Sequence, residues 1–180
     1  MRSANRRMNG VRLTNGMSAY NVFTANERLR KLQAMYRLFP RKSHPYYHGA
    51  CHLCGDPDSP VVPHDEDYSL PYVWQAPAVR ALCNWCHRRI HGRFTHANAW
   101  EAYLRHVSRG GYGSDLRSPD IRRQIMAVLR AISNGEAMAL DVLRDVSPRD
   151  CWWERLSLHR HESVPYGKAI TPKNAVMSDA

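Results

Sequence analysis

Two Cys-x-x-Cys pairs constrain this chain more than any other feature of its sequence. Cys51 and Cys54 form the first pair, Cys83 and Cys86 form the second, and 28 residues lie between the pairs. A two-residue spacer lets both sulfurs of a pair face one point, and four thiolates satisfy the tetrahedral preference of zinc. The spacing therefore predicts a structural Zn²⁺ site that joins two distant parts of the chain.

Three histidines predict a second metal site beside the first. His87 and His91 directly follow the second cysteine pair and stand four residues apart, so a helix starting at that pair would carry both imidazoles on one face. A short β-branched run at 61–62 leads to His64, which three acidic residues follow. With a return strand near 72–75, the three imidazoles and a carboxylate would meet, an arrangement typical of a hydrolytic metal site.

These motifs follow one another in a characteristic order over about residues 51–91. The order is Cys-x-x-Cys, then His-x-Glu-Asp-Tyr-Ser-x-Pro, then Val-Arg-x-Leu-Cys-x-x-Cys-His-x-x-x-His. It resembles the zinc-containing HNH endonucleases of phages and mobile elements. The resemblance implies a small ββα-metal zinc core. Together with helical N- and C-terminal extensions, which the apolar patterning outside 51–91 predicts, the expected fold class is α+β. It also implies a catalytic Mg²⁺ or Mn²⁺ ion beside the structural Zn²⁺, and hydrolysis of DNA phosphodiester bonds by nicking or cleavage.

By position, the resemblance makes His64, His87 and His91 ligands of the catalytic cation. Asp65 stands where these enzymes usually carry the histidine that acts as general base, and Ala78 stands where many carry an asparagine. An aspartate with its ordinary pKa of ~3.9 is a poorer base at neutral pH than a histidine at ~6.5. Either Asp65 or His64 is expected to activate water. The alternative is a catalytically degenerate HNH scaffold that binds nucleic acid or grips a host protein.

Basic residues are concentrated near the N-terminus. Residues 1–50 hold ten Lys or Arg and one acidic residue, which accounts for +9 of the net +10 of the 180-residue chain. Such a block attracts polyanions, and contacts with phosphates make the binding sensitive to salt. We therefore expect DNA as the partner. The candidate contact residues are Arg28, Lys31, Arg41, Lys42, Arg88 and Arg89.

Patterning divides the chain into four parts. They are a basic arm and helix (1–43), the HNH-like zinc core (44–92), a helical extension (93–158) and a loose tail (159–180). Thr24 or Asn26 is expected to cap the N-terminal helix, at about 27–39. The extension has no catalytic constellation, so we expect it to pack on the core or to hold a phage or host protein.

Apolar residues at spacings of three and four predict the helices of the extension. One helix should begin near His96, one at Pro119 after Ser118, and one should span 136–146. Trp152 and Trp153 are expected in the core.

The fifth cysteine and the other histidines are not expected to bind a metal. Cys151 is expected to be a small buried side chain. His44, His48 and His52 are predicted to be surface or phosphate-contacting residues. His96 and His106 are predicted to lie on polar helix faces.

The sequence contains no run of about 18 apolar residues and no apolar stretch of a secretion signal at its basic start. We therefore expect no membrane span. Reduced thiols are expected, in a cytoplasmic protein that would occupy the host cytoplasm if a phage encodes it.

Overall fold

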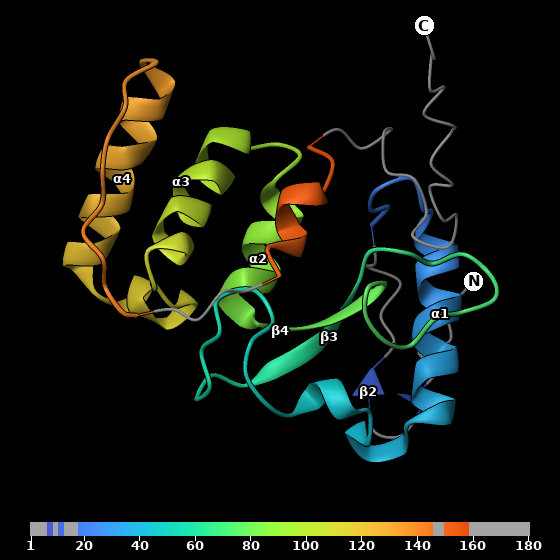
Figure 1. The fold of residues 1–180 in the computed structure, drawn as a ribbon. Coiled ribbons are helices and arrows are strands. Elements are labelled where there is room, and N and C mark those ends of the chain that lie inside the picture. Colours follow the sequence, from blue (N-terminus) through green and yellow to red (C-terminus); the bar gives the residue numbers. More distant parts are fainter. Residues whose placement is uncertain (1–6, 9–10, 13–17, 146–149, 159–180) are drawn as a thin grey trace, which may run out of the picture.

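The computed structural model describes residues 7–8, 11–12, 18–145 and 150–158. This part of the chain has a small α+β fold, with four α-helices and antiparallel strand pairs (Figure 1). The predicted tail, 159–180, and most of the predicted N-terminal arm lie outside the described residues. None of the described helices is long and apolar enough to cross a membrane.

An antiparallel strand pair lies at the centre of the molecule (Figure 1). β3 (Val61–Asp65) pairs with β4 (Val79–Cys83), and α2 (Asn84–Gly92) begins directly after β4. The predicted return strand at 72–75 is wrong. That segment belongs to the loop between the strands, where Pro71 and Pro77 lack the N–H that a strand ladder needs.

α1 (Ala25–Leu38) stands to one side of the strand pair. Its start is fixed by a capping box, in which the N–H of Glu27 donates to Thr24 Oγ1 and the N–H of Thr24 donates to the Glu27 carboxylate. This confirms Thr24 as the cap. The helix ends two residues before Pro40, because proline disfavours helical backbone in the residue that precedes it. Further upstream, β1 (Arg7–Met8) pairs with β2 (Val11–Arg12).

α3 (Ala97–Ser108) and α4 (Pro119–Ser133) lie on the opposite side of the molecule from α1 (Figure 1). Both helices start close to the predicted positions. The helix predicted over 136–146 does not form in its described part. Residues 136–145 instead run as an extended strap along α4, and the N–H of Leu143 donates to the Arg109 carbonyl at 2.8 Å. Backbone and side-chain bonds to the α3–α4 connection hold the strap in this form.

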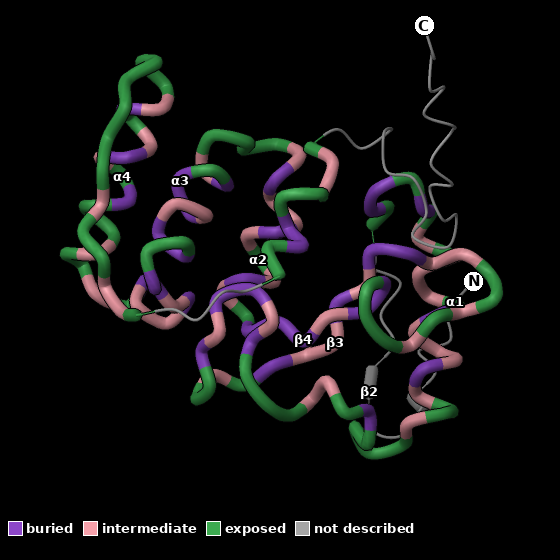
Figure 2. Tube along the Cα trace, viewed as in Figure 1, coloured by how far each residue is buried: buried purple, intermediate pink, exposed green. Residues whose placement is uncertain are grey.

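One buried cluster joins the strand pair to α2, α3 and α4, and Figure 2 shows its buried segments on all of these elements. Trp152 and Trp153 belong to it, as predicted, in the short 3-10 helix Trp152–Arg155. Trp152 Nε1 donates to the His52 carbonyl at 3.0 Å. The segment 150–158 therefore returns over the first cysteine pair.

Three surface and burial predictions are wrong. Cys151 is exposed, because it precedes the 3-10 helix whose tryptophans fill the core. His44 is buried, with one ring nitrogen 2.8 Å from the Trp74 carbonyl. His106 is also buried, and its Nε2 lies 3.1 Å from the Tyr112 carbonyl. Backbone partners thus satisfy both imidazoles inside the fold.

Candidate metal centres

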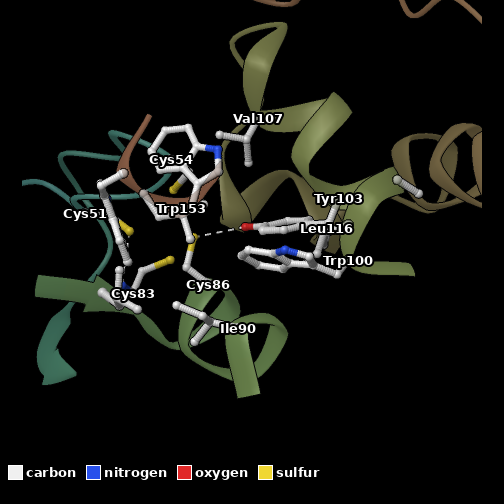
Figure 3. Packing of buried hydrophobic residues seen from close by; sticks show 14 of the residues in the cluster. Cys51, Cys54, Cys83, Cys86, Ile90, Trp100, Tyr103, Val107, Leu116 and Trp153 are labelled. Atoms are coloured by element: carbon white, nitrogen blue, oxygen red, sulfur yellow. Dashed lines mark hydrogen bonds between the residues drawn. The ribbon is translucent and has the colours of Figure 1, made fainter. Parts of the chain in front are cut away.

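Four cysteine sulfurs meet beside the strand pair (Figure 3). Cys51 and Cys54 lie in the loop ahead of β3, Cys83 ends β4, and Cys86 lies in the first turn of α2. All four residues are buried, and their Sγ atoms all lie within 4.8 Å of one another. Zn–S bonds of about 2.3 Å place tetrahedral sulfurs about 3.8 Å apart. The group could therefore hold a metal such as zinc.

The surroundings of the sulfurs fit a cation. The N–H of Cys83 points to Cys51 Sγ at 3.3 Å, and the hydroxyl of Tyr103 lies 3.0 Å from Cys86 Sγ, as the dashed line in Figure 3 shows. Burial, followed by the three neighbouring thiols, raises the pKa of Cys86. Gathering four thiolates here therefore needs a positive charge among them, which a soft divalent metal provides.

Three histidines form a second group. His64 comes from β3, while His87 and His91 lie one turn apart on α2. Their ligand atoms all lie within 4.8 Å of one another, and the Nε2 atoms of His87 and His91 are 3.1 Å apart. The His64 ring centroid is 5.1 Å from that of His87 and 5.2 Å from that of His91. The structure thus brings together the three imidazoles that the sequence analysis singled out.

The helix imidazoles are neutral at physiological pH. Burial lowers the pKa of His87 to about 4 and that of His91 to about 3, and the nearby positive charge of Arg28 adds to the effect. A neutral imidazole offers a lone pair to a metal. Nitrogen donors of this kind suit Zn²⁺, Fe²⁺ or Ni²⁺, whereas Mg²⁺ prefers oxygen. The three-histidine group therefore fits a transition-metal cation better than Mg²⁺.

Glu66 contacts His64 and also binds residues of the N-terminal segment. Its Oε1 lies 2.7 Å from His64 Nε2 and accepts the Tyr20 hydroxyl at 2.6 Å. Its Oε2 accepts Asn21 Nδ2 at 3.0 Å and Arg93 Nη2 at 2.8 Å. Burial alone would raise the pKa of Glu66, but the contacts with His64, Arg93 and Tyr20 prevail and lower it to about 2. Glu66 is therefore an ionised carboxylate inside the protein.

Asp65 faces a different environment from that of the histidines. Its Oδ1 lies 2.5 Å from Lys31 Nζ, and that amine also donates to the Asp67 carbonyl at 2.7 Å. Burial raises the pKa of Asp65, and Lys31 works against this effect. The structure does not bring Asp65 to the three imidazoles. Lys31, which the sequence suggested as a DNA contact, is 0% exposed and is not at the surface.

Arg28, a predicted DNA contact on α1, lies close enough to the histidines to affect them. Its guanidinium lies 5.1 Å from the ring centroid of Tyr20 and 5.4 Å from that of Tyr68. Its charge contributes to the lowered pKa values of His87 and His91. Arg28 therefore places a positive charge beside the imidazoles.

The other predicted DNA contacts are at least partly accessible. Arg41 and Lys42 are exposed in the turn after α1, and Arg88 is exposed on α2. Arg89 is half-buried, with its guanidinium 5.8 Å from the ring centroid of Tyr103. These side chains lie on two separate elements, α2 and the turn after α1.

Sequence reasoning missed the roles of Tyr20 and Arg93, and it passed over Glu66. A signal existed for Glu66, because alternate residues of a strand point to the same face and His64 stands two positions before it. Tyr20 lies about 30 residues before the first cysteine pair, and Arg93 directly follows Gly92, where the predicted core ends. No local pattern marks them as partners of a strand residue.

No protein-family model matches the chain, and no curated protein or solved structure matches it. Two groups of side chains in the described residues could hold metal ions. One offers four buried sulfurs, and the other offers three imidazoles with a buried carboxylate behind them.

Proposed function

We propose that the chain is a metal-dependent DNA endonuclease of the HNH type, with Zn²⁺ on the four cysteines and a second divalent cation on His64, His87 and His91. One observation carries the proposal. The three imidazoles converge from a strand and a helix, and that same helix supplies Cys86 to the sulfur group. In the proposal, β3, β4 and α2 constitute the ββα-metal core that the motif resemblance implies.

The residues of the chain have separate tasks in this proposal. A divalent cation on the imidazoles would neutralise charge on a phosphodiester and lower the pKa of water nearby. Arg28 lies beside the imidazoles, where its charge attracts a phosphate. Arg88 is exposed on the helix that carries two of the imidazoles, and it fits a contact with the DNA backbone.

The ion pair of Asp65 with Lys31 is compatible with hydrolysis under this scheme. A cation that lowers the pKa of water reduces the demand for a strong general base. With the pKa of a nearby water lowered in this way, bulk solvent could accept its proton, so Asp65 would not be needed as the base. The three imidazoles would hold the cation.

Cleavage of a supercoiled plasmid tests the proposal. Wild type should nick or linearise the plasmid with at least one of Mn²⁺, Co²⁺, Ni²⁺ or Mg²⁺, and His91→Ala should leave it intact while it keeps its zinc. His96→Ala is the matched control, because His96 is exposed and lies outside the group. An intact plasmid with folded, zinc-loaded wild type in all four cations would contradict the proposal.

The ion pair between Asp65 and Lys31 favours a second candidate, a degenerate HNH scaffold that binds DNA without cutting it. The position that would carry a general base is occupied by a carboxylate tied to a buried lysine. In this case His91→Ala should keep the DNA affinity of wild type. Replacing Arg41 and Lys42 by Ala should weaken binding and reduce the salt slope by about 2.

A further inference from the structure

A buried network surrounds Glu66 and reaches well beyond His64. Glu66 receives hydrogen bonds from the N-terminal segment through Tyr20 and Asn21, and from Arg93 beyond the end of α2. Arg93 is 0% exposed, and its Nε donates to the Ser157 carbonyl at 3.0 Å. The N-terminal segment, β3 and the residue after α2 therefore meet at one carboxylate, and Arg93 connects this group to the segment 150–158.

We propose that Glu66 is a positioning residue that fixes the His64 imidazole for metal binding. This inference rests on the proposed function only in that it takes His64 as a metal ligand. A carboxylate hydrogen-bonded to one ring nitrogen fixes the tautomer and the orientation of an imidazole and makes it a better donor. The 2.7 Å contact between Glu66 Oε1 and His64 Nε2 has this form, and it leaves the other ring nitrogen for a metal.

Arg93 extends this positioning to the helix that carries the other two imidazoles. Its Nη2 donates to Glu66 Oε2 at 2.8 Å, and its Nη1 donates to the carbonyl of Ile90 at 2.9 Å. Ile90 directly precedes His91 on α2. The Arg93 guanidinium therefore connects Glu66, the partner of His64, to the C-terminal end of α2. In this way it sets the separation between His64 and His91.

Tyr20 connects the N-terminal segment to the same group. Its hydroxyl donates to Glu66, and its ring lies 4.3 Å from the ring of His91 between centroids. Tyr20 is buried, and so is Asn21. The turn that contains them therefore covers Glu66 and holds it against His64.

Metal affinity of the histidine group tests this role independently of DNA cleavage. The cysteine group is first filled with one equivalent of Zn²⁺, and Co²⁺ is then titrated while its visible absorption is followed. Glu66→Gln keeps the shape of the side chain and removes its charge. It should weaken Co²⁺ binding about 10- to 100-fold and change the absorption spectrum of the bound ion, while zinc content remains that of wild type.

Asp115→Asn is the matched control. Asp115 is also a carboxylate held by an arginine, Arg144, through two hydrogen bonds, but it contacts none of the three imidazoles. This variant should bind Co²⁺ as wild type does. Equal Co²⁺ affinity in folded Glu66→Gln and wild type would overturn the inference, and so would an equal loss in the control.

Two further outcomes are decisive. Glu66→Gln could fail to fold because Arg93 loses its counter-charge. In that case Tyr20→Phe is the variant to be titrated with Co²⁺. That change removes one hydrogen bond to Glu66 and keeps the ring, so it should weaken Co²⁺ binding severalfold, and an unchanged affinity would overturn the inference. Failure of wild type to bind Co²⁺ would overturn both this inference and the proposed metal centre, whereas metal binding without DNA cleavage would overturn the nuclease proposal alone.

Discussion

At the scale of single residues, three neighbours on and after β3 have different environments. His64 and Glu66 face the imidazole group, while the intervening Asp65 pairs with Lys31. Strand alternation explains the division, since successive side chains point to opposite faces. The sequence displays this alternation, but it does not show which face α2 covers. It also does not show that a lysine from α1 reaches Asp65, because such long-range partners are fixed by packing.

Replacement of Lys31 should destabilise the fold. Lys31→Met leaves Asp65 largely buried and without its cation, so the free energy of unfolding should fall by about 3 kcal/mol in urea titrations. Arg30→Met, at an exposed neighbour on α1, should change it by less than about 0.5 kcal/mol. Equal stability of the two variants would contradict the buried pair. Lys31→Met should also leave the salt slope of DNA binding unchanged, because the amine is not at the surface.

The carboxylate of Asp115 should give stability that depends on pH. Burial would raise its pKa, but the bonds from Arg144 and from the N–H of Tyr112 prevail, and the pKa is lowered. Because the folded pKa lies below the unfolded value of ~3.9, the stabilisation is complete above about pH 4 to 5. It is lost as the pH falls through the folded pKa. Asp115→Asn should lower the free energy of unfolding by about 1–3 kcal/mol at pH 7.

Urea unfolding of wild type and Asp115→Asn at about pH 7, 5 and 3 checks this expectation. The difference between the two proteins should be the same at the two higher pH values and smaller at the lowest. A difference that stays constant down to the lowest pH would show that the ionised carboxylate is not the source of the stabilisation.

At the scale of elements, helices with explicit boundary signals and the strand leading to His64 were predictable, whereas the return strand and the strap were not. Thr24 with Glu27, and Ser118 with Pro119, mark helix starts that the structure confirms. The apolar spacing within 136–145 is typical of a helix, but the segment forms an extended strap. The hydrogen bond from the Leu143 N–H to the Arg109 carbonyl stabilises the extended form. It joins residues that are too far apart in sequence for a local pattern to reveal.

Two glycines test how the strap is held. Gly110 has φ +86°, and a Cβ there would lie 2.3 Å from the Arg144 carbonyl oxygen. Gly135 has a similar φ of +73°, but a Cβ there would meet no atom within 4 Å. Gly135→Ala should cost about 1 kcal/mol of unfolding free energy for its backbone conformation alone. Gly110→Ala should cost a further 1–3 kcal/mol or so, because the strap must move.

Chemical denaturation of both glycine variants measures the difference. Equal destabilisation of the two variants would contradict the close approach of Arg144 to Gly110, because the positive φ alone would then account for both losses. A larger loss in Gly110→Ala, together with faster proteolysis of the strap, is the expected result.

At the scale of the whole molecule, the sulfur group joins the loop at Cys51, the strand pair and α2. Zinc binding free energy becomes folding free energy in such a site. Cys83→Ser should therefore lose zinc and unfold the central unit, which circular dichroism and zinc content would show. Cys151→Ser is the matched control, because this exposed thiol lies outside the group and its replacement should change neither. A folded Cys83→Ser protein without zinc would contradict the structural role.

The side chains that could hold metal ions were predictable as a set, whereas the residues that support them were not. Cysteine spacing and the His87–His91 repeat follow from local geometry, so the sequence was sufficient to predict both groups. Glu66 and Arg93 meet only after α2 packs on the strand pair. The return strand, β4, was also misplaced, because the loop over residues 66–78 separates it from β3 and no local pattern fixes where that loop ends.

The proposed function requires two cations in one chain, at two distinct groups of side chains. Native mass spectrometry in excess Zn²⁺ counts them most directly. Two ions should be bound by wild type and by Cys151→Ser, and a single ion by the double variant His87→Ala/His91→Ala, which should still fold. One ion in wild type, or two ions in the double histidine variant, would contradict the account.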